Sequence, residues 1–142
     1  MKKCKDIMTE DLVYASPQDA VTRVAQLMKT EDIGPVLIVD NEESRTLVGI
    51  VTDRDLALKV VAEGRDPNTT KVDEVMTRKL VTCRAEDDVD VAMKAMAQYQ
   101  LRRIPVVDDG MRLVGIIAQA DVATRAGEPE KTAEVVKEIS EP

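Results

Sequence analysis

A short polar run directly after an apolar segment carries the side chains best suited to chemistry. Thr52 follows the apolar run 47–51, and residues 52–55 are typical of a helix start. Free backbone N–H groups at a helix start favour an anion, and the Arg54 guanidinium can bind a phosphate through two parallel hydrogen bonds. Asp55 can accept hydrogen bonds from two adjacent hydroxyls of a ribose. The same spacing also fits a plain helix cap, in which Thr52 and Asp55 only satisfy backbone groups.

The segment 115–121 has the same form with fewer polar groups. Asp121 takes the place of the second aspartate, while alanines at 118 and 120 replace the threonine and the arginine. Cations can come instead from Arg102 and Arg103, at positions that are uncharged in the first segment. We therefore expect two sites with complementary sets of basic residues. The two arginines equally fit a solvated strand entry.

These two segments belong to an internal repeat. Met8-Thr9 aligns with Met76-Thr77, and the alignment continues without a gap to Val39-Asp40 and Val107-Asp108. Beyond this point the second copy is two residues shorter, and the difference falls in the polar run 41–44, which is typical of a turn. A length difference that coincides with a turn is expected of a true structural repeat.

Each copy predicts the same order of elements, β-α-β-β-α. In the first copy, residues 12–15 are extended, and Ser16-Pro17 begins a helix with serine as its N-cap. The apolar runs 36–39 and 47–51 predict strands buried on both faces, and a helix follows from about Asp53 to Ala62. A unit of roughly 55 residues buries little surface alone. We therefore expect the two units to pack sheet against sheet into one α/β (α+β) body.

The domain division follows the repeat. We expect a first unit at residues 1–62, a linker at 63–71, a second unit at 72–125 and an acidic tail at 126–142. The linker is rich in turn-forming residues. The tail is interpreted as a marginal helix or a frayed end.

The repeated motifs resemble those of tandem CBS-domain proteins, in which the pair is called a Bateman module. The resemblance covers about residues 5–125. It is carried by the Met-Thr runs 6–9 and 73–77, by Leu-Arg-Arg-Ile-Pro-Val-Val-Asp at 101–108 and by the Gly-x-x-Thr-x-x-Asp motif at 49–55. The family implies two β-α-β-β-α units with pseudo-two-fold symmetry, homodimers, and an adenosine-containing ligand in the cleft between the units.

The resemblance also implies which residues bind this ligand. The motif aspartate holds the ribose, the threonine contacts ribose or phosphate, and an apolar slot with backbone groups receives the base. The first predicted set is Tyr14, Ser16, Ile33, Gly34, Thr52, Arg54 and Asp55; the second is Thr82, Arg84, Leu101, Arg102, Arg103 and Asp121. The ring of Tyr14 either stacks on a base or fills the slot. The arginines favour a phosphate-bearing regulatory ligand (AMP, ADP, ATP or NAD) over S-adenosylmethionine.

Composition narrows the function classes. The 142 residues include no His, Phe or Trp, and the formal net charge is −7. Without histidine, the usual catalytic zinc site and histidine acid–base chemistry are excluded, and the acidic balance disfavours nucleic acid as a partner. No apolar run approaches the roughly 18 residues of a membrane span. We therefore expect no enzyme, no metal, no membrane partner and a cytoplasmic location, with Cys4 exposed and Cys83 a buried apolar filler.

Two functions are compatible with these features. The leading hypothesis is a stand-alone regulatory, signal-transduction module: an adenosine-containing nucleotide binds and changes the conformation, and an unknown effector protein reads the change. The alternative is a non-catalytic dimerisation or interaction platform with a vestigial ligand cleft. An increase in melting temperature on adding nucleotide distinguishes the two.

Overall fold

The structure, a computed structural model, describes residues 2–122. The acidic tail expected at 126–142 lies outside these residues. The described chain divides into two compact units. We call residues 13–80 the repeat-one unit, and residues 2–12 with 81–122 the repeat-two unit.

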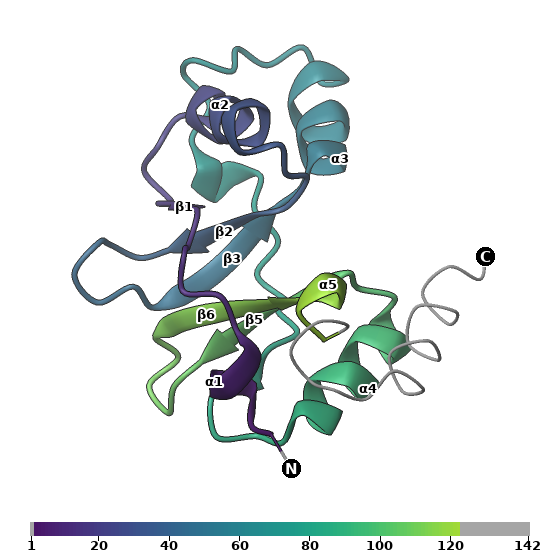
Figure 1. Cartoon of the computed structure of the whole chain (residues 1–142). Helices are drawn as coiled ribbons and strands as arrows, with labels where there is room; N and C mark the ends of the chain where they lie inside the picture. Colours follow the sequence, from purple (N-terminus) through teal and green to yellow (C-terminus); the bar gives the residue numbers. More distant parts are fainter. Residues whose placement is uncertain (1, 123–142) are drawn as a thin grey trace. The chain divides into compact units, whose positions relative to one another are not determined.

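The repeat-one unit has the order β-α-β-β-α (Figure 1). Its strands form a sheet of order β1-β2-β3, with β1 parallel and β3 antiparallel to β2. In Figure 1, α2 and α3 lie on the same side of this sheet. The elements are β1 (Tyr14–Ala15), α2 (Val21–Glu31), β2 (Val36–Val39), β3 (Leu47–Val51), α3 (Asp53–Leu56), its π-helical continuation η1 (Ala57–Val61) and the 3₁₀ turn η2 (Val72–Glu74).

The repeat-two unit repeats this order and adds one short helix before it. Its sheet has the order β4-β5-β6, again with one parallel and one antiparallel pairing. The elements are α1 (Cys4–Ile7), β4 (Cys83–Arg84), α4 (Val89–Tyr99), β5 (Arg103–Val107), β6 (Leu113–Ala118) and α5 (Gln119–Asp121). The prediction of two β-α-β-β-α units in a mixed α/β fold is therefore confirmed.

Each unit has its own aliphatic core. In the repeat-one unit, Val21 and Val24 of α2 pack with β2, β3 and Val72. In the repeat-two unit, α1, α4 and strands β4 to β6 share one cluster. Burial on both faces is confirmed for β2. It is wrong for β3, where every second residue is only partly buried, because one face of the strand packs on the core and the other is partly accessible; β6 has the same alternation.

The Met-Thr runs cover the exposed edges of β3 and β6. Thr9 exchanges two backbone hydrogen bonds with Ile116, of 2.9 and 3.0 Å, and Thr77 does the same with Ile50, at 2.9 and 3.0 Å. The first run thus belongs to the repeat-two unit and the second to the repeat-one unit. The compact units therefore differ from a division at 1–62 and 72–125. The backbone pairings join the run before the first repeat to β6 of the second repeat, and the run before the second repeat to β3 of the first.

Each Met-Thr run is also fixed by a methionine that packs against a glycine. A Cβ atom at Gly49 would lie 2.7 Å from Met76 Sδ, and one at Gly115 would lie 2.7 Å from Met8 Cγ. Real side chains do not tolerate such approaches. The glycine in each Leu-Val-Gly-Ile run is thus required by the close approach of a methionine.

The start of α2 differs from its prediction. The helix begins at Val21, whereas Ser16 and Asp19 form a turn in which Asp19 Oδ2 accepts a 2.9 Å hydrogen bond from the Ser16 backbone N–H. The N–H of Val21 donates to the Thr70 carbonyl at 2.9 Å, which holds Ala20 in an extended conformation. Thr70 is buried, so this part of the predicted linker is packed against its unit.

We expect Gly115→Ala to lower the free energy of unfolding by about 1–3 kcal/mol, because the new methyl group overlaps the Met8 side chain. Urea unfolding followed by far-UV circular dichroism measures this effect. Gly110→Ala is the matched control: it lies in the β5–β6 turn, its nearest neighbour is 3.6 Å away, and its expected change is within about 0.5 kcal/mol. Equal stability of the two variants would contradict the close methionine–glycine packing.

Candidate functional site

The aspartate of the first motif lies at a helix start directly after β3. Thr52 is the N-cap of α3: its hydroxyl accepts a hydrogen bond from Asp55 N at 3.1 Å, and Asp55 Oδ2 accepts one from Thr52 N at 2.9 Å. Lys59 Nζ lies 3.1 Å from Asp55 Oδ1 and donates to the Val75 carbonyl at 2.9 Å. The capping interpretation is thus realised. A carboxylate has about four acceptor positions, so the Asp55 carboxylate can still accept hydrogen bonds from sugar hydroxyls.

Other residues of the first predicted set gather at the same end of the sheet. Val36 of β2 pairs with Val51 of β3, so the chain before β2 runs beside the α3 start. A Cβ atom at Gly34 would lie 3.8 Å from Asp53 Oδ1. Ile33 precedes this glycine and packs on the core. Arg54 is exposed and has no ion-pair partner among residues 2–122.

The second motif has a simpler helix start. Asp121 Oδ2 accepts a hydrogen bond from Ala118 N at 2.9 Å, but Ala118 offers no hydroxyl in return. The N–H of Gln119 donates to the Arg102 carbonyl at 3.0 Å, and Arg103 pairs with Ala118 across the sheet. The structure therefore brings Arg102, Arg103 and Asp121 together.

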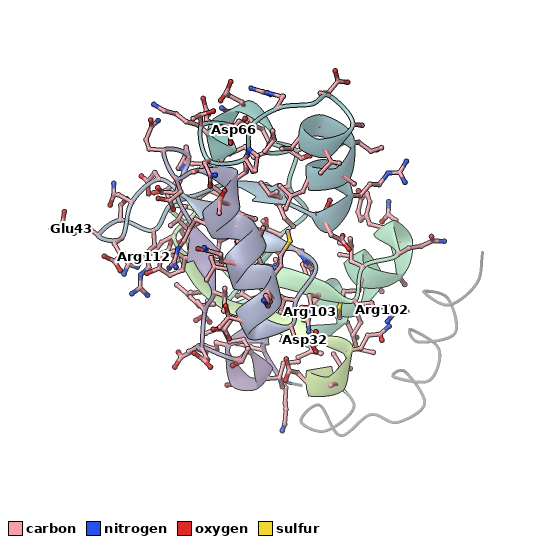
Figure 2. The ribbon with its side chains drawn as sticks, turned by 90° about the horizontal axis from the view of Figure 1, so that it is seen from above. Asp32, Glu43, Asp66, Arg102, Arg103 and Arg112 are labelled. Atoms are coloured by element: carbon pink, nitrogen blue, oxygen red, sulfur yellow. The ribbon has the colours of Figure 1, made fainter. Side chains whose placement is uncertain are left out.

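The two arginines of the second motif are exposed cations. Both carry solvent-accessible side chains, and neither has an ion-pair partner in the part of the chain that the structure describes (Figure 2). Leu101, directly before them, packs partly buried against the repeat-two core. This end of the sheet therefore combines two exposed cations with a carboxylate and an apolar neighbour.

Arg84 lies at the other end of the same sheet. It pairs with Val107 at the end of β5, and its guanidinium forms an ion pair with Asp109. Thr82 precedes β4 and is partly buried. The parallel pairing of β4 with β5 places Arg84 beside the carboxyl end of β5. Asp121 follows β6, whose last residue pairs with the first residue of β5, so the structure does not bring Arg84 to Asp121.

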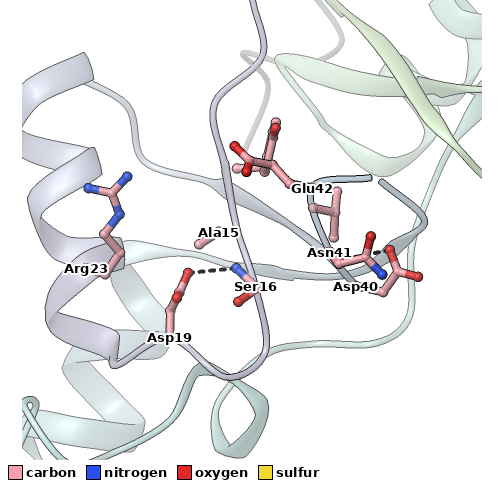
Figure 3. Close-up of a pocket in the computed structure, with 9 residues that line it drawn as sticks. Ala15, Ser16, Asp19, Arg23, Asp40, Asn41 and Glu42 are labelled. Carbon is pink, nitrogen blue, oxygen red and sulfur yellow. Dashed lines mark hydrogen bonds between the residues drawn. The ribbon is translucent and has the colours of Figure 1, made fainter. Parts of the chain in front are cut away.

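Tyr14 and Ser16 line a cleft of about 390 Å³ in the repeat-one unit (Figure 3). The guanidinium carbon of Arg45 lies 5.3 Å from the centre of the Tyr14 ring, a cation–π distance. One face of the ring therefore contacts an arginine. The five other residues of the first set are not among those that line this cleft: Ile33, Gly34, Thr52, Arg54 and Asp55.

The cleft also contains polar residues that sequence reasoning missed. Arg23 comes from α2, and Asp40, Asn41 and Glu42 come from the β2–β3 turn. A hydrogen bond from the Ser44 hydroxyl, with others from the Asn41 and Thr46 backbones, holds the pKa of Asp40 below its ordinary value. Turn residues have no periodic pattern, so only the sheet pairing reveals their position. Lys59 was also missed, although its spacing four residues after Asp55 was a usable signal.

Cys4 differs from its prediction as an exposed residue. Its relative exposure is 0%, and it shares the repeat-two core with Cys83, which is 2% exposed. The prediction is wrong because α1 is bound to the loop after β4. Across residues 2–122, no three His, Cys, Asp or Glu side chains are grouped so that they could hold a metal ion. None of the described helices is long and apolar enough to cross a membrane.

Comparison with known proteins agrees with this architecture. Residues 4–62 and 72–128 match the model of the CBS domain. The uncharacterized protein YlbB of Bacillus subtilis is 40% identical over 141 residues, which cover 99% of this chain and 93% of YlbB.

Two solved structures extend the comparison. Hypoxic Response Protein I, solved with two coordinated zinc ions, has a TM-score of 0.75 at 33% identity and covers 87% of this chain and 98% of its own. The CBS domain pair of protein MJ0100, in complex with 5′-methylthioadenosine and S-adenosyl-L-methionine, has a TM-score of 0.70 at 30% identity, covering 89% and 100%. With two matched repeats and these relatives, the chain belongs to the CBS-domain family as a tandem CBS pair.

Proposed function

We propose that this CBS pair is a regulatory module that binds an adenosine-containing ligand and passes its occupancy to a partner protein. The observation that carries the proposal is the repeated helix start, where Asp55 and Asp121 each lie in the first turn after an apolar strand. The related CBS pair of MJ0100 supports the ligand class, because it was solved with two adenosine compounds.

The exposed arginines beside the two motif aspartates favour a phosphate on this ligand. Arg54 is exposed beside the first aspartate, and Arg102 and Arg103 are exposed beside the second, without ion pairs among residues 2–122. Guanidinium groups bind phosphate with two parallel hydrogen bonds. We therefore propose AMP, ADP, ATP or NAD ahead of the phosphate-free compounds bound by MJ0100. Binding changes the conformation only if the ligand prefers one arrangement of the module.

A ligand screen with matched variants tests this function. We expect at least one of AMP, ADP, ATP, NAD, 5′-methylthioadenosine and S-adenosylmethionine to raise the melting temperature of the wild-type chain. Asp55→Asn or Asp121→Asn should then weaken that ligand about tenfold or more in calorimetry, since a hydrogen bond to a charged acceptor contributes about 1.5–3 kcal/mol. Asparagine still accepts the backbone hydrogen bond, so the helix start is preserved.

The control for this experiment is Asp53→Asn, which removes the same charge from the same helix. Asp53 is exposed, and its carboxylate accepts from the Arg54 backbone N–H. We expect its affinity to stay within about twofold of wild type, because the substitution removes no proposed ligand contact. If Asp53→Asn weakens ligand binding as much as the motif variants do, the loss of affinity comes from the change in net charge and not from a lost contact. A folded wild type whose melting temperature responds to no compound in the panel would contradict the proposal.

The missing hydroxyl at position 118 gives a second prediction. Ala118→Thr recreates the side chain of Thr52 and should raise the free energy of unfolding by about 1 kcal/mol through a restored N-cap. Thr52→Ala should lower it by a similar amount, whereas Thr52→Ser keeps the hydroxyl and serves as the control. If the hydroxyl also contacts the ligand, calorimetry will show tighter binding for Ala118→Thr and weaker binding for Thr52→Ala. Unchanged affinity in both would restrict the hydroxyl to capping.

An exposed apolar pair on η1 favours homodimerisation as a second role. Leu58 and Val61 are 50% and 76% exposed and lie three residues apart in η1. Exposed apolar groups of this kind are typical of association surfaces. Val61→Lys should therefore shift the mass measured by light scattering from dimer towards monomer, with Ala62→Lys as the control. A wild type that is monomeric at high concentration would exclude this role.

A further inference from the structure

Two buried thiols are in contact in the core of the repeat-two unit. Cys4 comes from α1 and Cys83 from β4, and both belong to one core cluster. The two thiols interact with each other, and this interaction shifts the pKa of both. Each thiol also donates to a carbonyl: Cys4 Sγ to that of Asp88 at 3.8 Å, and Cys83 Sγ to that of Pro105 at 3.9 Å.

The backbone enforces this contact. Cys4 N donates to the Asp87 carbonyl at 2.8 Å, and Lys5 N donates to the Ala85 carbonyl at 3.0 Å. Lys5 Nζ adds an ion pair with Glu86 at 2.8 Å. These bonds attach α1 along the loop that follows β4, so Cys4 enters the same core cluster as Cys83 wherever α1 is bound.

We propose that Cys4 and Cys83 form an intramolecular disulfide when the protein meets a peroxide or a small-molecule disulfide. With hydrogen peroxide, the Cys4 sulfur attacks one peroxide oxygen, the O–O bond breaks, and a sulfenic acid and water result. The Cys83 sulfur then attacks the sulfenic sulfur, and a second water leaves as the S–S bond forms. In total, two thiols lose two electrons and two protons, and one peroxide is reduced to two waters. With a small-molecule disulfide, the Cys4 sulfur breaks its S–S bond, forms a mixed disulfide and releases one thiol; the Cys83 sulfur then attacks the Cys4 sulfur and releases the second thiol.

The environment assigns different roles to the two sulfurs. The interaction with Cys83 lowers the pKa of Cys4, although burial and the charges of Asp87 and Asp88 oppose this effect. The same interaction, together with burial, raises the pKa of Cys83. Because the thiolate is the reactive form, these directions favour Cys4 as the attacking residue and Cys83 as the resolving one.

Access to Cys4 depends on local opening of the structure. The residue is 0% exposed, so an oxidant reaches it only when α1 leaves the loop after β4. Once formed, the disulfide fixes α1 and the adjoining Met8-Thr9 segment to the repeat-two unit. It also closes a loop of roughly 80 residues that contains the whole repeat-one unit, and closing such a loop restricts the unfolded chain.

The test uses the full chain, reduced, freed of reductant and treated with oxidised glutathione, which spares the seven methionines that peroxide would also oxidise. After unfolding and treatment with a maleimide, mass spectrometry counts the free thiols. We expect none in the oxidised monomer, and a tryptic product in which residues 4–5 are linked to residues 80–84. The melting temperature should rise by roughly 5–10 °C and return on reduction.

Cys4→Ala and Cys83→Ala serve as the matched controls and should show neither the linked peptide nor the temperature shift. The wild-type measurement stands without them if either variant fails to fold. Two maleimide-reactive thiols after oxidation, a stable glutathione adduct on Cys4 alone, or a disulfide between two chains would each overturn the proposal. No ligand is present in this experiment, so its outcome is separate from that of the nucleotide screen.

Discussion

The backbone pairings at the edges of β3 and β6 are the constraint on which both units depend. Thr77 covers the edge beside Ile50, and Thr9 covers the edge beside Ile116. Without these partners each three-stranded sheet would expose a row of backbone groups next to its core. The methionine before each threonine packs against the glycine of the edge strand, which allows the two chains to approach. The strand that leads into each motif aspartate is thus held from both sides.

This constraint explains why the two motif helices begin alike although their side chains differ. In both units the aspartate carboxylate binds the backbone N–H three residues earlier, at 2.9 Å. In the repeat-one unit, Thr52 and Lys59 add a hydroxyl and an ion pair around this carboxylate. In the repeat-two unit, Ala118 offers no hydroxyl, and the nearby cations are Arg102 directly before β5 and Arg103 at its start. The backbone frame is common to both units, whereas the polar groups around it are distributed differently.

The sequence predicted the elements well because apolar periodicity and the repeat act locally. It could not predict the start of α2, since the Thr70 carbonyl that holds Val21 lies almost fifty residues away. The burial of Cys4 was missed for the same reason, because α1 is packed only through its contacts with the loop after β4. The motif aspartates and their threonine were found from spacing. Arg84 and Ser16 were grouped with them through the family resemblance, yet the direction of β4 and β1 places both at the other end of their sheets.

Each Met-Thr run pairs with the repeat other than the one it precedes, and this affects the order in which the two units can fold. The repeat-one unit uses the continuous segment 13–80, so all of its contacts are available once that segment has been synthesised. The repeat-two unit needs Thr9 to meet Ile116, a pairing across more than one hundred residues. Contacts of such separation form slowly, because a long loop must close before they contribute any stability. During synthesis, the pairing of Thr9 with Ile116 therefore cannot form until the last strand of the second repeat has emerged from the ribosome.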